Sequence, residues 1–147
     1  MSNVDPEDPP RKPRRPPPIV TADSAGFWEA AAEQRLVAQR CGDCGRLRHP
    51  PRPMCPQCHS LSIEVVPLSG RGSLYSYSVL HHPQHPAFDY PVLAALVDLE
   101  EGVRLVSNLT GVEPADIRIG MPLEVDFEAR EGGTSVPVFR PRGSTSS

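Results

Sequence analysis

The sequence has no long hydrophobic run. Nothing in its 147 residues approaches the roughly 18 consecutive apolar positions of a membrane-spanning helix, and the N-terminal segment lacks the apolar core of a secretory signal. We therefore expect a cytoplasmic protein with no membrane partner. The length leaves room for one compact domain plus attachments, which excludes a large multidomain enzyme.

Aromatic residues and net positive charge are also scarce. Aromatics make up 5% of the chain, and the formal net charge is −3 at pH 7. A general nucleic-acid binder needs a strongly positive groove, so this composition disfavours nucleic acid as a partner. The charge is uneven, however, because residues 98–131 are mainly acidic. Residues 35–52 hold a single acid, Asp43, beside five arginines, Arg35, Arg40, Arg46, Arg48 and Arg52. We expect this end to attract anions such as phosphate groups, with ordinary solvated charge as the alternative.

A convincing catalytic constellation is missing as well. Ser73, His82 and Asp89 contain the residue types of a nucleophilic relay, but the sequence has no strained nucleophile turn. Gly70-Arg71-Gly72 lacks the Lys-Ser/Thr continuation of a phosphate-binding loop. We therefore expect no catalytic residue in this chain.

Cysteine occurs at only four positions, and these form two C-x-x-C pairs. Cys41 and Cys44 are separated from Cys55 and Cys58 by ten residues. Two such turns facing each other supply four thiolates in a tetrahedron, which is how zinc is held in closed structural sites. Four sulfur ligands leave no open coordination position, so the sequence predicts a structural metal rather than a catalytic one.

Other uses of the four cysteines are weaker. Two disulfides do not fit a chain without an export signal, and a redox dithiol needs one pair only. Iron accepts the same four thiolates, so metal binding is better founded than the choice of zinc over iron. His49 and His59 flank the pairs and could replace a ligand, but four cysteines already suffice.

The N-terminal part divides into an arm and a helix. Residues 1–22 are rich in proline and charge, which predicts a flexible arm. In residues 23–40 the apolar side chains of Phe27, Trp28, Ala31 and Leu36 recur at helical spacing, which predicts an amphipathic helix over 25–39. The two rings either dock onto the rest of the domain or face a partner protein.

The remainder is typical of a small β protein. After a ribbon at 41–62, strand patterns separated by Gly, Pro and acidic turns predict an OB-type barrel over 63–142, with a small sandwich as the alternative and a floppy tail at 143–147. The expected strands are Ile63–Val66, Gly72–His81, Val92–Leu99, Val103–Leu109, Met121–Glu128 and Val136–Phe139. One short helical segment is expected near 114–117. The proline-rich connection at 81–91, with His82 and Phe88, is either a contact loop or a plain strand connection.

The order of these motifs resembles a known family. Cys41-x-x-Cys44-Gly45 is followed by Pro50-Pro51-Arg52-x-x-Cys55-Pro56-x-Cys58 and by Gly70-x-Gly72-x-Leu-Tyr75-Ser76-Tyr77. Over roughly residues 25–142 the chain resembles the rubredoxin-like zinc-ribbon plus OB-fold proteins associated with acyl-CoA enzymes, long known as a domain of unknown function. His59 departs from the family pattern, where glycine often completes the second turn.

This resemblance implies an accessory role. Members of the family typically act as non-catalytic companions of thiolase-like enzymes or hydratases, so the chain is expected to help form the CoA-thioester site of an aldolase that cleaves a hydroxyacyl-CoA of the steroid side-chain type. The alternatives are a bridging subunit of a thiolase/synthase or hydratase complex and a nucleic-acid-binding module. The candidate partner- or substrate-binding residues are Phe27, Trp28, Arg48, Arg52, Tyr77, His82 and Phe88.

Overall fold

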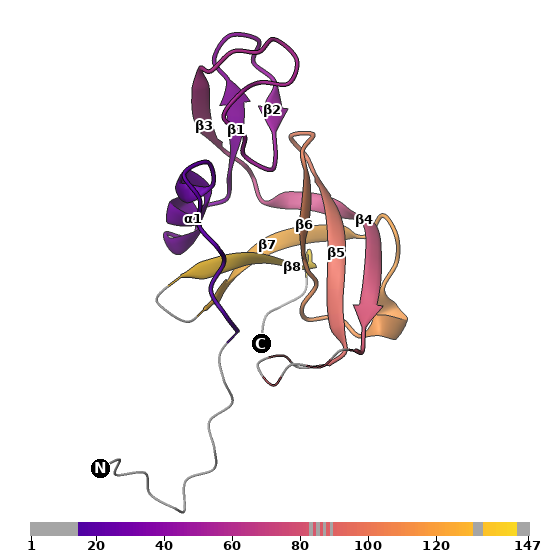
Figure 1. The fold of residues 1–147 in the computed structure, drawn as a ribbon. Helices are drawn as coiled ribbons and strands as arrows, with labels where there is room; N and C mark the ends of the chain where they lie inside the picture. The colour runs from indigo at the N-terminus through magenta and orange to yellow at the C-terminus, as the bar shows by residue number, and fades with distance from the viewer. Residues whose placement is uncertain are drawn as a thin grey trace, which may run out of the picture.

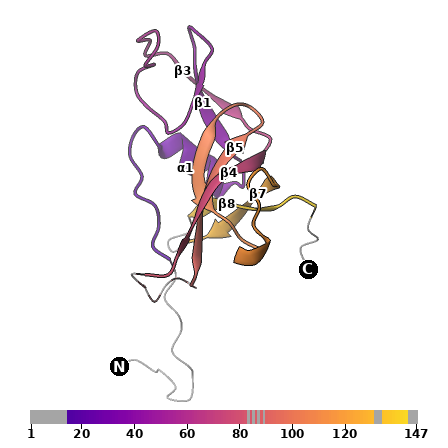
Figure 2. The ribbon, with the colours of Figure 1, turned by 90° about the vertical axis from the view of Figure 1, so that its right-hand side faces the viewer.

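The computed structural model describes residues 15–82, 84, 86, 88, 90–130 and 134–143. Over these residues the chain forms one α-helix, one 3-10 turn and eight strands arranged in two sheets (Figure 1). A small ribbon sheet stands at one end of a five-stranded barrel, and the helix α1 lies beside both (Figures 1 and 2). The predicted mainly β fold with an N-terminal helix is therefore confirmed. No helix among the described residues has the length and hydropathy needed to cross a membrane.

Helix α1 spans Ala25–Ala32 and is shorter than predicted. The chain turns at Gln34, whose φ of 61° is left-handed. The Gln34 amide donates to the Ala31 carbonyl at 2.9 Å and the Arg35 amide to the Ala30 carbonyl at 2.8 Å, which is a Schellman ending. The expected helix over 25–39 is therefore wrong beyond residue 32, because this cap releases the chain into a strand.

The ribbon sheet has the strand order β2-β1-β3, with all pairs antiparallel. Strand β1 is Val37–Cys41, β2 is Leu47–Arg48 and β3 is Ile63–Pro67. Strands β1 and β2 were not predicted from the sequence. Strand β3 was predicted correctly as a strand but was assigned to the barrel, whereas Ile63 pairs with Cys41 in the ribbon sheet. The ribbon thus extends on both sides of residues 41–62.

The barrel has the strand order β6-β5-β4-β7-β8. Its strands are β4 (Arg71–Leu80), β5 (Val92–Leu99), β6 (Arg104–Asn108), β7 (Pro122–Ala129) and β8 (Ser135–Pro141). The two end strands meet through a parallel bridge between Leu109 and Phe139 and a 2.8 Å hydrogen bond from the Ser107 hydroxyl to the Pro137 carbonyl. With the 3-10 turn η1 at Pro114–Asp116 after β6, this nearly closed barrel confirms the OB fold over the sandwich.

The core fills the barrel interior. Leu74, Val97, Leu123 and Phe139 are fully buried. Gly72 lies where β4 crosses β5 closely, since a Cβ there would stand 2.3 Å from the Asp98 carbonyl oxygen. Only glycine fits this crossing.

The described end of the arm rests on the barrel. The Arg15 guanidinium lies 4.3 Å from the centre of the Phe88 ring, 3.4 Å from Asn108 Oδ1 and 3.6 Å from a Glu128 carboxylate oxygen. Residue 15 is therefore held, which differs from the expectation of a flexible arm over all of residues 1–22. Residues 1–14 of that arm and residues 144–147 of the expected tail lie outside the described residues.

Candidate metal centre and surrounding surfaces

The four cysteines converge at the far end of the ribbon. Their sulfur atoms all lie within 4.8 Å of one another, with Cys41 Sγ 3.5 Å from Cys58 Sγ and Cys44 Sγ 3.6 Å from Cys55 Sγ. Four sulfurs at about 2.3 Å from one zinc ion stand about 3.8 Å apart in a tetrahedron. The spacing therefore fits a four-thiolate metal site.

Two turns of the same design aim these sulfurs. The Cys41 amide donates to the Arg46 carbonyl and the Gly45 amide to the Cys41 carbonyl, at 2.9 and 3.0 Å. In the second turn, the Cys55 amide donates to the Ser60 carbonyl and the His59 amide to the Cys55 carbonyl, both at 2.9 Å. His59 adopts a φ of 61°, close to the 76° of Gly45. The family departure at His59 therefore leaves the geometry of the turn intact.

The turns also prepare the sulfurs to carry negative charge. The amides of Cys44 and Asp43 lower the pKa of Cys41 to about 6, and those of Cys58 and Gln57 lower the pKa of Cys55. At Cys58 the Ser60 amide acts in the same direction, but the neighbouring Cys41 sulfur and the loss of hydration outweigh it and raise the pKa to about 12. Because thiolates in contact repel one another, a bound cation is what allows all four to ionise together.

Arg48 of β2 and Arg52 of the loop that follows lie together on the ribbon. Gln39 of β1, only 7% exposed, joins them. Its Oε1 accepts a 2.8 Å hydrogen bond from Arg48 Nε and a 2.9 Å bond from the Arg52 amide. Arg48 Nη2 also donates to the Arg52 carbonyl at 3.1 Å. The two arginines that the sequence singled out are thus held on one polar framework.

The aromatic pair on α1 belongs largely to the core. Phe27 is 8% exposed, contacts Trp28 edge-on at 4.9 Å and packs 5.1 Å from the ring of His49. Burial lowers the pKa of His49. Phe27 and the half-buried Trp28 line a groove of about 590 Å³ that α1, the ribbon and the edges of β6 and β8 enclose. Docking of the Phe27 ring onto the domain is therefore its principal structural role.

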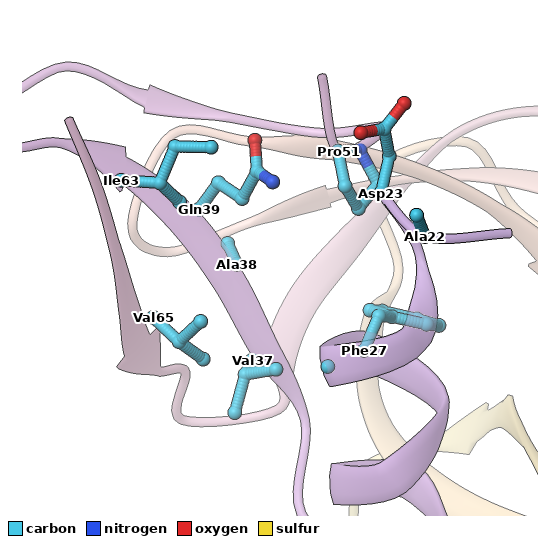
Figure 3. A pocket seen from close by; sticks show the side chains of 10 residues that line it. Ala22, Asp23, Phe27, Val37, Ala38, Gln39, Pro51, Ile63 and Val65 are labelled. Atoms are coloured by element: carbon cyan, nitrogen blue, oxygen red, sulfur yellow. The ribbon is translucent and has the colours of Figure 1, made fainter. Parts of the chain in front are cut away.

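A second, smaller groove lies on the other side of Phe27. It measures about 230 Å³ and runs between the start of α1 and the ribbon sheet (Figure 3). Val37 and Ala38 of β1 form its floor, and the exposed side chains of Ile63 and Val65 form the opposite wall. The junction of helix and ribbon thus presents apolar surface.

The remaining candidate residues lie elsewhere. Tyr77, 38% exposed, is on β4. His82 follows β4 and is exposed, whereas Phe88 is half-buried. Strand β4 ends and β5 begins at the end of the barrel away from the ribbon (Figures 1 and 2). The seven candidates therefore do not form one continuous site, and their roles in binding remain predictions.

Two residues that lie near Arg48 were not singled out from the sequence. One is Gln39, whose buried amide orients Arg48. The other is Arg104, whose guanidinium stacks 3.5 Å above the Tyr75 ring and pairs with Asp98, with Nε 2.6 Å from Oδ1. This pairing lowers the pKa of Asp98. The acidic turn with Gly102 between the expected strands Val92–Leu99 and Val103–Leu109 was the available signal, because a short turn there places residues 98 and 104 opposite each other.

The fold and the sulfur cluster define a zinc-ribbon protein joined to an OB-fold barrel. Comparison with known families agrees with this class. Residues 28–64 match the ChsH2 rubredoxin-like zinc ribbon domain, and residues 65–128 match the ChsH2 C-terminal OB-fold domain. The chain belongs to this family, which confirms the resemblance found in the sequence.

Individual relatives are subunits of CoA-thioester enzymes. The chain is 50% identical, over 86% of its length and 40% of the relative's, to a probable enoyl-CoA hydratase alpha subunit of Thermomonospora curvata. It thus spans less than half of that relative. It is 34% identical to the benzoylsuccinyl-CoA thiolase subunit BbsA of Thauera aromatica, over 90% of this chain and 93% of the relative. A solved structure described as the Ltp2-ChsH2(DUF35) aldolase superposes with a TM-score of 0.82 at 50% identity, covering 85% of this chain and 98% of that one.

Proposed function

We propose that this chain is a non-catalytic accessory subunit of a thiolase-like acyl-CoA enzyme, most specifically an aldolase that cleaves a hydroxyacyl-CoA of the steroid side-chain type. The observation that carries the proposal is the likeness to a chain of the Ltp2-ChsH2(DUF35) aldolase over nearly its whole length. The described residues also contain no nucleophile, base and orienting group in mutual contact, so the chemistry is expected to reside in the partner. We place the assembly in the cytoplasm.

The metal has a structural role in this proposal. Cys41, Cys44, Cys55 and Cys58 would hold zinc, whose four-thiolate coordination leaves no position for substrate. These ligands join the two cysteine turns, in which residues 42–46 and 56–59 are exposed. Holding the ribbon rigid positions the arginines and the apolar grooves at its base.

A bridging subunit of a thiolase/synthase or hydratase complex is the second candidate. It is favoured by the names of the relatives, one a hydratase alpha subunit and one a thiolase subunit. Both candidates share the central point that the chain lends surface to another chain's active site. A nucleic-acid-binding role has only the general use of OB barrels in its favour.

The candidate partner contacts are at least partly exposed. Trp28 at the larger groove and Tyr77, His82 and Phe88 on the barrel are proposed as contacts with the enzyme, while the buried Phe27 contacts the Trp28 ring edge-on. The CoA thioester is proposed as the substrate of the complex rather than of this chain alone.

Co-expression tests the proposal. The chain is produced with a thiolase-like acyl-CoA enzyme of the same organism, with a tag on the enzyme only, and the mass of the purified complex is measured. We expect a stable hetero-oligomer containing one zinc per copy of this chain. Tyr77→Ala should weaken it, whereas Ile119→Ala, at an exposed apolar residue outside the candidate set, serves as the matched control. Failure of the two chains to co-purify with thiolase-like enzymes would argue against the accessory role.

A further inference from the structure

Strand β3 is an open edge of the ribbon sheet. In the order β2-β1-β3 it pairs with β1 on one side, and no strand of the described residues lies on its other side (Figure 1). Proteins usually protect such an edge with proline or with charged side chains, because its unpaired backbone groups can bind a further strand. Here Pro67 stands only at the end of the strand, and the one charged residue, Glu64, is neutralised by Arg40. The edge is therefore weakly protected.

Hydrogen bonds at the two ends of β3 determine which of its backbone groups are free. The Gly42 amide donates to the Ser62 carbonyl at 3.0 Å, and the Leu68 amide donates at 2.9 Å to the residue that precedes β1. Because backbone groups alternate in direction along an antiparallel strand, the even-numbered residues of β3 bond to β1. The amides and carbonyls of Ile63 and Val65 therefore point away from the sheet.

The side chains beside this edge are apolar. Leu61, just before β3, and Ile63 and Val65 within it are all exposed. Ile63 and Val65 form one wall of the 230 Å³ groove at the start of α1 (Figure 3). The opposite face of the strand carries the ion pair of Glu64 with Arg40, whose N–O distance is 2.6 Å. Free hydrogen-bonding groups thus lie next to exposed apolar side chains without uncompensated charge.

We propose that β3 pairs antiparallel with β3 of a second copy of this chain and joins two ribbon sheets into one. A two-fold axis through the junction makes every contact reciprocal. Centring the pair on Glu64 would place two carboxylates directly opposite each other, which is unfavourable. Centring it on Val65 would place Pro67, which has no N–H, opposite Ile63 and so remove hydrogen bonds.

The register that meets neither obstacle is centred on Ile63. It places Ile63 opposite the same residue of the other copy, Leu61 opposite Val65, and Glu64 opposite the uncharged Ser62. Because each of its three outward-facing pairs exchanges two backbone bonds, this register forms about six hydrogen bonds. Apolar side chains also lie opposite apolar side chains along the groove. A second copy supplies this match by symmetry, whereas another extended segment would need the same pattern in its own sequence.

Sedimentation equilibrium tests the pairing on the full, zinc-loaded chain. One strand pair is a small interface, so the average mass should rise from one copy toward two only between about 10 µM and 1 mM. Val65→Lys adds a charge at the edge and should keep the chain as a single copy throughout. Val106→Lys, at an exposed apolar residue of β6, is the matched control and should dimerise like the native chain. The zinc content of each variant shows that its ribbon is folded.

Amide hydrogen exchange locates the contact. At about 1 mM the amides of Ile63 and Val65 should exchange at least about threefold more slowly than in dilute protein. Those of Glu64 and Val66, which face β1 within each copy, should change little. The proposal is overturned by a single copy at every concentration, by a dimer in which Ile63 and Val65 gain no protection, or by an equal effect of the two lysine variants. Protection of these amides only in the presence of the enzyme would assign the edge to the enzyme and would also overturn it.

Discussion

At the scale of single residues, the two cysteine turns share one backbone shape but differ at the corner. Gly45 occupies a left-handed corner without cost, while His59 adopts nearly the same φ with a side chain attached. A non-glycine residue in this region is disfavoured by roughly 1–2 kcal/mol. The second turn is therefore the less relaxed half of the metal site.

Replacing His59 by glycine should relieve this cost. After the greater freedom of glycine in the unfolded chain is subtracted, we expect His59→Gly to stabilise the metal-bound ribbon by about 0.5–1 kcal/mol. Competition with a zinc chelator measures the effect. Gly45→Ala is the reciprocal variant and should weaken zinc binding, since its Cβ meets no atom within 4 Å and only the backbone is strained. Weaker zinc binding by His59→Gly would contradict this view of the turn.

Asp98 gives a pH-dependent prediction. Hydrogen bonding to Arg104 lowers its pKa in the folded state, so the pair contributes stability above the unfolded pKa of about 3.9 and loses it as the pH falls through the folded value. Asp98→Asn should therefore reduce the free energy of unfolding slightly at pH 7. The difference from the native chain should shrink below about pH 4, as urea titrations followed by circular dichroism can show. A difference that grows at low pH would contradict the assignment.

At the scale of elements, the ribbon and the barrel differ in what holds them. The barrel buries Leu74, Val97, Leu123 and Phe139 completely, whereas every residue of β3 except the half-buried Val66 is exposed. In the ribbon sheet only β1 is mainly buried, and the residues of the two cysteine turns other than Cys41 and Cys55 are mostly exposed, so this end of the ribbon depends on its cross-links. Metal binding is then the main source of the ribbon's folding free energy.

Removal of the metal should unfold the ribbon first. With a strong chelator, amide hydrogen exchange is expected to accelerate in β1, β2 and β3 while β4, β5 and β7 remain protected. Cys55→Ser should have the same regional effect without chelator. Simultaneous loss of protection in both sheets would show that the barrel also depends on the metal.

Phe139 closes the barrel and should be costly to truncate. It is fully buried on β8 at the junction with Leu109, so Phe139→Ala is expected to lower the free energy of unfolding by about 3–5 kcal/mol. Ile119→Ala, at a side chain that is 64% exposed, should change it by less than about 0.5 kcal/mol. Denaturant unfolding of the zinc-loaded chains compares the two.

The elements differed in how well the sequence predicted them. The six expected strands were confirmed within one or two residues at most ends, because apolar alternation and glycine or proline turns are local signals. Strands β1 and β2 were missed because Val37 and Ala38 continue an apolar pattern that also fits a helix. The deciding feature was the left-handed turn at Gln34, for which glutamine is not a typical residue.

At the scale of the whole molecule, the metal site was predictable, and the shared hydrogen-bond framework of Arg48 and Arg52 was not. The spacing of the cysteines alone brings their sulfurs together. The framework instead needs Gln39 from the missed β1, Arg48 from the two-residue β2 and the backbone at Arg52. Their proximity depends on how the strands of the ribbon pair, and sequence patterns carry little information about such placement.

The arrangement of the two sheets also separates the two ends of the molecule. The ribbon sheet lies at one end of the molecule, and the end of β4 and the start of β5 lie at the other (Figure 1).

Turnover of a hydroxyacyl-CoA thioester, measured for this chain alone, for a thiolase-like enzyme of the same organism alone, and for the purified pair, tests the accessory role most directly. The account predicts no carbon–carbon cleavage by this chain alone, little by the enzyme alone, and full activity only when both are present. Turnover by the solitary chain, or full activity of the enzyme without it, would contradict the account.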